Sequence, residues 1–104
     1  MNVVDSSAWL EYFADSENAK NFAEIIENFE ELIVPTVIIY EVFKVIVRQK
    51  TIGDAEIAIE FMQNGIVVGL DIDTALLAAQ LSLQNSIPMA DSIIYAVTKQ
   101  SNAT

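Results

Sequence analysis

The sequence contains no cysteine and no histidine. The absence of cysteine excludes structural disulfides, thiolate zinc sites and a cysteine nucleophile. The absence of histidine excludes imidazole metal ligands and a Ser-His-Asp triad. Any catalysis must therefore use carboxylates, hydroxyls, Lys, Arg, or a metal ion that is held by oxygen ligands.

Positive charge is also scarce. Five Lys and Arg residues stand against 15 Asp and Glu residues, which gives a formal net charge of −10. A surface this acidic repels phosphates as a whole, so nucleic acid can be held only through a bound cation or one local basic stripe. No segment resembles a targeting signal, and the longest apolar stretch, residues 32–47, is shorter than the roughly 20 residues of a bilayer helix. We expect a cytoplasmic protein.

The hydrophobic fraction of 53% is sufficient for one core, and we expect a single domain over residues 1–104. Short apolar runs alternate with helical periods, which is typical of an α/β fold with a parallel sheet. The pattern predicts three strands, at residues 2–5, 32–34 and 66–70. It predicts six helices, at residues 6–13, from about 17 through 29, 36–49, 55–63, 73–84 and 88–100.

Asp5 follows the first predicted strand directly. Ligands of open parallel sheets bind outside the carboxyl ends of the strands, so this position favours a functional carboxylate. An equally plain interpretation is that Asp5 caps the next helix. The two roles are compatible, because a capping carboxylate can also face a ligand.

Glu41 lies among apolar residues on a predicted helix that has little room for a solvent-facing side. A buried carboxylate without a partner costs several kcal/mol, so Glu41 needs a cation or hydrogen-bond donors. The alternative is an ion pair with Lys44, three residues further on, which is worth only ~0.3–0.5 kcal/mol if it is exposed.

Asp91 lies in the first turn of the last predicted helix, where the helix dipole alone accounts for an acidic residue. Turns and helix caps explain three other aspartates still better, and we assign them no chemistry: Asp54, Asp71 and Asp73.

Lys44 and Arg48 share one helical face with Glu41 and, together with Lys50, form the only basic cluster in the chain. This cluster favours contact with a phosphate backbone beside the carboxylates. The alternative is that these cations only complement the carboxyl end of their helix.

Three segments together resemble a known family. Residues 3–13, Val-Val-Asp-Ser-Ser-Ala-Trp-Leu-Glu-Tyr-Phe, are similar to the opening of PIN-domain ribonucleases, especially the VapC-type toxins of toxin–antitoxin pairs. Residues 35–45 resemble the second motif of the family, whose glutamate falls on Glu41. Residues 87–96 resemble the third motif, whose aspartate falls on Asp91.

The resemblance implies a PIN-like three-layer α/β/α fold and metal-dependent cleavage of RNA. It implies that Asp5, Glu41 and Asp91 hold Mg²⁺ or Mn²⁺, and that Ser7 or Ser6 orients a carboxylate or a water molecule. Carboxylates about 4 Å apart repel by about 4 kcal/mol per pair, so three together favour a divalent cation. Ligands that are all oxygen select hard cations such as these. The resemblance also implies a cognate antitoxin as partner.

The chain departs from the family pattern at its end. Family members continue into another strand with a fourth acid, whereas this sequence stops at residues 101–104, so we expect the fold to be truncated after the last helix. The first strand would then have an open edge, and we expect a homodimer, another chain or a helix to cover it.

Three functions follow as hypotheses. The first is the toxin ribonuclease, and the second is a catalytically silent PIN-like remnant that binds another protein. The third is an acidic scaffold in which Glu41 pairs with Lys44 or Arg48.

An apolar groove is predicted where the helix from Thr36 meets the following helix. Four residues of that second helix are candidates to line it: Ile57, Ile59, Phe61 and Met62. Ordinary packing between the two helices is the favoured explanation for any one of these residues. A surplus of apolar surface would suit an antitoxin helix or a second copy of the chain.

Overall fold

A computed structural model describes residues 1–103, and Thr104 lies outside the described residues. Three short parallel strands form one sheet in the order β1-β2-β3. They are β1 (Asn2–Val3), β2 (Leu32–Pro35) and β3 (Ile66–Val68). Within residues 1–103 the helices are α1 (Ser6–Phe13), α2 (Ala19–Ile26), the 3-10 helix η1 (Phe29–Glu31), α3 (Thr36–Gln49), α4 (Ile52–Met62), α5 (Ile72–Asn85) and α6 (Met89–Gln100).

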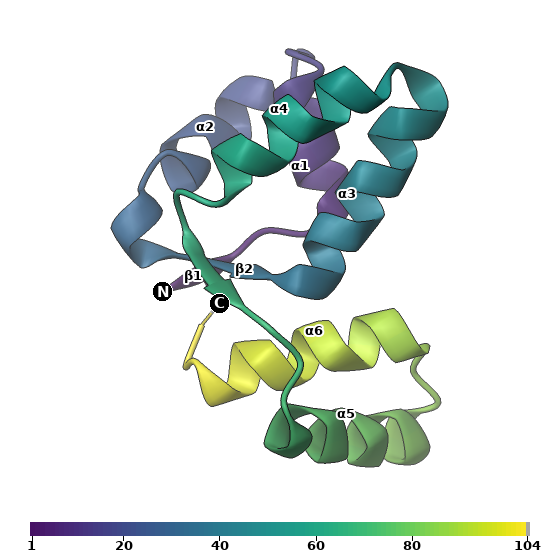
Figure 1. The fold of residues 1–104 in the computed structure, drawn as a ribbon. Coiled ribbons are helices and arrows are strands. Elements are labelled where there is room, and N and C mark those ends of the chain that lie inside the picture. Colours follow the sequence, from purple (N-terminus) through teal and green to yellow (C-terminus); the bar gives the residue numbers. More distant parts are fainter. Residues whose placement is uncertain (104) are drawn as a thin grey trace.

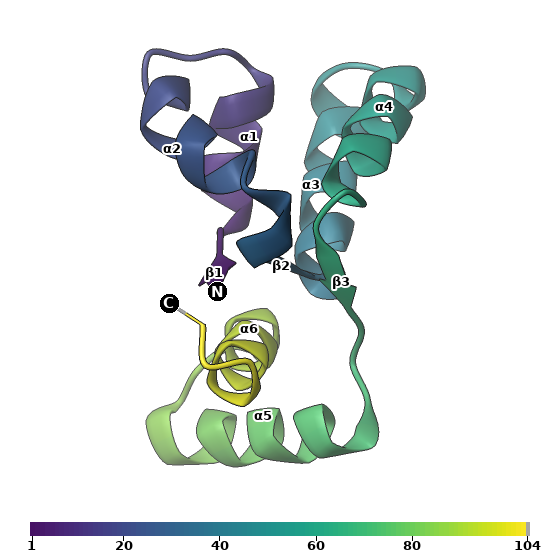
Figure 2. The same ribbon diagram turned by 90° about the vertical axis from the view of Figure 1, so that its left-hand side faces the viewer.

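The elements form three layers, as the resemblance implied. Helices α1 to α4 lie on one side of the sheet, and α6 lies on the other with α5 packed beneath it (Figures 1 and 2). The strand alternation in the sequence therefore predicted the α/β fold and its parallel sheet correctly.

Several predicted boundaries are wrong because helix caps lie earlier than expected. The Thr51 hydroxyl accepts a hydrogen bond from the Asp54 amide at 3.0 Å, so α4 begins at Ile52 rather than at Ala55. Asp71 accepts the Thr74 amide at 2.8 Å, so α5 begins before Asp73. The second helix is shorter than predicted, and residues 29–31 form η1 instead.

Strand β2 is the centre of the core, and all four of its residues are buried. The largest buried side chains of this core are Leu32 of β2 itself and residues of all four helices above the sheet: Trp9, Ile26, Ile38, Val42 and Met62. A second, smaller cluster joins α5 to α6 through Ala78, Ile93 and Ala96, with Val37 of α3 packed against it. Helix α3 therefore packs against both clusters, and Glu41 on this helix is half-buried.

No helix in residues 1–103 combines the length and the apolar character needed to cross a membrane.

Candidate functional site

Asp5 is held at the carboxyl end of β1. Its Oδ1 accepts the Ala8 amide at 2.8 Å and the Ser7 hydroxyl at 3.0 Å, and its backbone is extended. Asp5 is therefore the cap of α1, as one of its two interpretations predicted. Both bonds use the same oxygen of an exposed carboxylate, so Oδ2 is left for a ligand.

Ser7 and Ser6 differ in their contacts. The Ser7 hydroxyl donates to Asp5 and so fixes the rotamer of that carboxylate, whereas the Ser6 side chain makes no hydrogen bond with the described residues. The orienting role predicted for either serine therefore has a geometric basis at Ser7 only.

Glu41 lies in the second turn of α3 and is half-buried. In residues 1–103 the only ion pair joins the Met1 amino group to Glu31, at 3.3 Å, and no hydrogen bond reaches Glu41. The ion pair with Lys44 or Arg48 that the scaffold hypothesis requires is therefore absent. The Lys44 ammonium lies instead over the Tyr40 ring, 5.7 Å from its centroid.

Asp91 is exposed in the first turn of α6 and accepts no hydrogen bond from the described residues. The adjacent Ser92 is buried, and its hydroxyl donates to the Met89 carbonyl at 2.7 Å. This bond ties the first turn of α6 together and leaves the Asp91 carboxylate directed to solvent or to a ligand.

The three acids lie on elements that meet at one end of the sheet. Strands β1 and β2 are parallel neighbours, so Asp5 and the start of α3 follow the same edge. Helix α6 runs back along the sheet, with its first turn toward that edge, and it contacts α3 (Figures 1 and 2). In the described residues, however, no three Asp or Glu side chains gather closely enough to hold a metal ion. The roles of Asp5, Glu41 and Asp91 stay predictions.

Lys44 and Arg48 line a wide, open groove of about 690 Å³ along the outer face of α3. The remaining lining residues are Thr36, Ile39, Tyr40, Phe43 and Val47. Glu41 is not among them, so the groove that Lys44 and Arg48 line does not include the acid.

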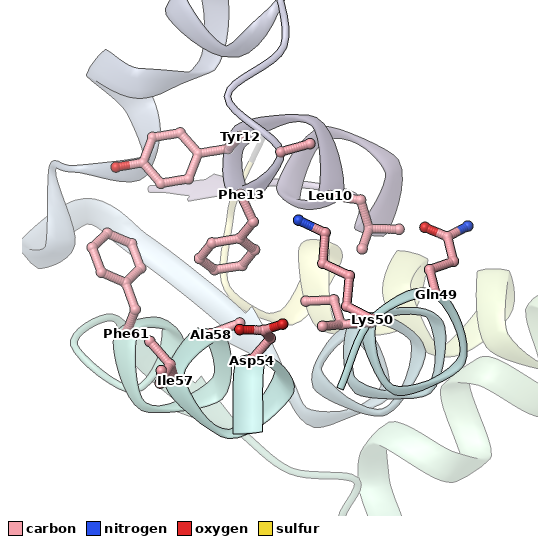
Figure 3. A pocket seen from close by; sticks show the side chains of 11 residues that line it. Leu10, Tyr12, Phe13, Gln49, Lys50, Asp54, Ile57, Ala58 and Phe61 are labelled. Carbon is pink, nitrogen blue, oxygen red and sulfur yellow. The ribbon is translucent and has the colours of Figure 1, made fainter. Parts of the chain in front are cut away.

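A second groove lies between α1, the carboxyl end of α3 and the length of α4 (Figure 3). Its volume is about 370 Å³, and most of its lining is apolar: Leu10, Tyr12, Phe13, Ala14, Ile46, Ile57, Ala58 and Phe61, with Gln49, Lys50 and Asp54. We call it the α1–α4 groove. Ile57 and Phe61 line it as predicted. The prediction for Met62 and Ile59 is wrong, because Met62 is fully buried and Ile59 packs against the core.

Aromatic rings form the floor of the α1–α4 groove. The Phe61 ring lies 5.7 Å from Tyr12, 5.8 Å from Phe13 and 5.5 Å from Phe29, centroid to centroid. Sequence reasoning assigned Tyr12 and Phe13 no part in a surface, and the structure shows that both pack against the core while they also line this groove.

Tyr12 also joins α1 to the end of α2. Its hydroxyl donates to Glu27 Oε2 at 2.7 Å. Burial, this hydrogen bond and the Glu27 charge together raise the pKa of Tyr12 to about 12. The hydrogen bond therefore favours the protonated form of the hydroxyl.

Strand β1 lies at one edge of the three-stranded sheet that residues 1–103 form. A groove of about 340 Å³ runs beside it, lined by Asn2, Val3, Val4, Asp5, Ala8, Phe22 and Ile25. That a second chain covers this edge stays a prediction.

One family model and two solved structures are similar to this chain. A family model described as PIN domain matches residues 3–104. A toxin–antitoxin complex from Klebsiella pneumoniae is similar in structure, with a TM-score of 0.80 and 14% identity over 99% of this chain and 82% of that chain. Mycobacterium tuberculosis VapC20, a toxin that cleaves the sarcin–ricin loop, is also similar in structure. Its TM-score is 0.81, and it is 15% identical over 99% of this chain and 85% of that chain. No curated protein matches significantly.

Proposed function

The chain belongs to the PIN-domain family, and on this basis we propose that it is a metal-dependent endoribonuclease, the toxin of a toxin–antitoxin pair. The observation that carries the proposal is Glu41, a half-buried carboxylate that no cation or donor within residues 1–103 satisfies. It stands beside the carboxyl edge of the sheet, where Asp5 also ends β1. RNA as substrate implies that the protein acts in the cytoplasm.

The donor set fits Mg²⁺ or Mn²⁺ in chemistry. Asp5, Glu41 and Asp91 offer only oxygen, and each has at least one carboxylate oxygen without a hydrogen bond in the described residues. Because these side chains do not gather closely enough, the proposal requires them to approach one another when the ion binds. A bound ion would activate water and neutralise the scissile phosphate.

The residues of the chain have separate tasks in this proposal. Ser7 positions the Asp5 carboxylate through its hydroxyl, which leaves Oδ2 for the cation. Lys44 and Arg48 lie one and two turns beyond Glu41 on α3 and contact phosphates that flank the cleavage point. They therefore hold the RNA strand in register without taking part in bond breaking.

The test is cleavage of RNA with Mg²⁺ or Mn²⁺ by the wild type and by three variants, Asp5→Asn, Glu41→Gln and Asp91→Asn. Each variant removes one charge from the metal ligands, so we expect activity to fall by at least about a hundredfold. Asp73→Asn is the matched control, because Asp73 is an exposed first-turn acid with no assigned role. If the three variants cut as fast as the control, the assigned acids are wrong.

One observation favours a second function. Because no three carboxylates gather in residues 1–103, a PIN-like module that binds a protein without cutting RNA also agrees with the geometry. Calorimetry with MnCl₂ separates the two. The nuclease requires heat of binding that Glu41→Gln abolishes, whereas the silent module gives no such heat.

We propose that the α1–α4 groove receives an amphipathic helix of the antitoxin. The groove offers aromatic and aliphatic side chains to an apolar helix face. Lys50 and Asp54 stand beside it without an ion pair in the described residues, so a partner helix that carries both an acid and a base is favoured (Figure 3).

Substitution of Ile57 tests the antitoxin site. Its side chain is 69% exposed, so Ile57→Glu should leave the fold intact while it places a charge in the groove. We expect the variant to lose the antitoxin, encoded by a small neighbouring reading frame, in co-purification. Ile52→Glu is the control, since Ile52 lies on the same helix but outside the groove. Equal capture by both variants would exclude the groove.

A further inference from the structure

The open groove along the outer face of α3 combines two stripes of side chains, and residues four apart on a helix share one face. The polar stripe occupies every fourth position of the helix: Thr36, Tyr40, Lys44 and Arg48. The apolar stripe runs beside it with the same spacing: Ile39, Phe43 and Val47. From its first residue to its last, the polar stripe is about 18 Å long. The groove therefore offers charge and apolar surface side by side to an extended ligand.

The charge of this groove differs from that of the chain as a whole. Its lining holds two of the five basic residues and no acidic one, although the net charge of the chain is −10. Within residues 1–103 neither Lys44 nor Arg48 forms an ion pair. Both positive charges are therefore available to a polyanion, which the acidic chain as a whole repels.

Two aromatic rings lie beside these charges. Tyr40 is 60% exposed, and the Lys44 ammonium lies 5.7 Å from the centroid of its ring. Phe43 is half-buried and packs against the core, so its ring is held in place where it lines the groove. Every nucleobase has a π-face that stacks on such rings. The faces of paired bases are covered by their neighbours in a duplex, so only unpaired bases can use the two rings.

An acidic protein segment is the other polyanion that Lys44 and Arg48 could hold. Such a segment would use the two cations, but its acidic side chains would gain little from the rings and the apolar stripe beside them. Single-stranded RNA carries phosphates and stacking faces on the same strand, so it matches both stripes at once. Charge and surface chemistry together therefore favour RNA as the occupant of this groove.

We propose that Tyr40 and Phe43 stack unpaired bases of the RNA while Lys44 and Arg48 contact its phosphates, so that the substrate is single-stranded where it meets α3. This inference rests on the proposed function, which makes RNA the substrate. It adds a reason for the protein to prefer unpaired strands. Tyr40 and Phe43 are binding residues in this proposal and take no part in bond breaking.

Binding of RNA in the presence of EDTA tests the proposal without cleavage. The probe is a fluorescein-labelled oligouridylate of about 12 nucleotides, alone or paired with oligoadenylate, and its anisotropy gives the dissociation constant. The wild type should bind the single strand more tightly than the duplex. Tyr40→Leu should weaken single-strand binding by at least about fivefold, because one stacked base is lost, and should leave duplex binding unchanged. Tyr40→Phe keeps the ring and should bind within about twofold of the wild type.

Tyr95→Leu is the matched control, because Tyr95 is 54% exposed on α6 and lies outside the groove. Salt dependence separates the rings from the charges. Tyr40→Leu should leave the slope of log K against log salt unchanged, whereas Lys44→Ala should reduce it by about 0.7. Phe43→Leu keeps an apolar side chain against the core and should also weaken single-strand binding. Circular dichroism of each variant establishes that the fold is retained.

Three results would overturn the proposal. Tyr40→Leu could bind the single strand as tightly as Tyr95→Leu does, which would exclude stacking on this ring. The wild type could bind the duplex as tightly as the single strand. Poly-L-glutamate could bind with the same dependence on Tyr40, which would assign the groove to an acidic protein instead.

Cleavage in Mg²⁺ is measured separately, so the two proposals can fail independently. A wild type that binds the single strand through Tyr40 but does not cut it contradicts the nuclease and supports the stacking site. A wild type that cuts RNA while Tyr40→Leu binds and cuts equally well supports the nuclease and contradicts the stacking site.

Discussion

Two glycines beside β3 provide a sharp test of the packing. An ideal Cβ on Gly65 lies 2.9 Å from Val34 Cγ2 and 3.1 Å from the Leu32 carbonyl oxygen, whereas a Cβ on Gly69 meets nothing within 4 Å. Carbon contacts are most favourable at about 3.5–4.0 Å. Val34 and Leu32 are both fully buried, so neither can move into solvent. Gly65→Ala should therefore strain β2 and β3, and Gly69→Ala should not.

The magnitude follows from two opposing effects. Overpacking in a dense core costs about 1–3 kcal/mol, and loss of chain freedom in the unfolded state returns about 0.4–1 kcal/mol. Gly65→Ala should therefore lower the free energy of unfolding by about 1–2 kcal/mol and Tm by about 5–15 °C. No glycine in residues 1–103 has a positive φ, so Gly69→Ala should be neutral or stabilising.

Thermal and urea denaturation followed by circular dichroism measure both variants. The comparison is decisive because the two glycines flank the same strand and the substitution is identical. If Gly65→Ala is as stable as Gly69→Ala, the close approach of the α4–β3 turn to β2 is wrong, and so is the placement of β3 that depends on it.

Further predictions concern titration and charge. Because the pKa of Tyr12 is raised to about 12, its contribution to stability is complete below pH 10 and is lost as the pH rises from 10 to 12. Tyr12→Phe should therefore make the free energy of unfolding fall less steeply with pH in this range, and Glu27→Gln should act in the same direction. The hydrogen bond from the Thr74 backbone, followed by that from the Thr74 side chain, lowers the pKa of Asp71. Its stabilisation is therefore complete above the ordinary pKa of 3.8 and is lost as the pH falls from there through the lowered pKa. Asp71→Ala should lower Tm at pH 7 and make Tm less sensitive to acid below about pH 4. Replacing Lys44 and Arg48 with Ala should weaken binding of single-stranded RNA and reduce the salt slope by about 1.4, or about 0.7 per phosphate contact. An unchanged slope in filter binding would exclude these two residues from the RNA interface.

Local patterns predicted most of the fold. Alternating apolar runs and helical periods identified the three strands and the six α-helices of residues 1–103, although not η1. A buried strand and an amphipathic helix each need their own spacing of apolar residues. The boundaries at Thr51 and Asp71 were missed because several capping residues lie close together there, and only the hydrogen bonds decide which one caps the helix. At Asp5 the sequence left a cap and a functional carboxylate as two interpretations, and the hydrogen bond from the Ala8 amide established the cap.

What the sequence by itself determined is the chemistry available to this protein: an acidic chain without cysteine or histidine, with carboxylates placed at a strand end, on a half-buried helix and in a first turn. Only the tertiary structure decided which charges are partnered. It left Glu41 without an ion pair to Lys44, placed Lys44 and Arg48 on a groove that does not include Glu41, and exposed an uncharged face on α5. The physical reason is that spacing along a helix determines which face a residue occupies, whereas the packing of the other helices determines whether that face meets a partner or water.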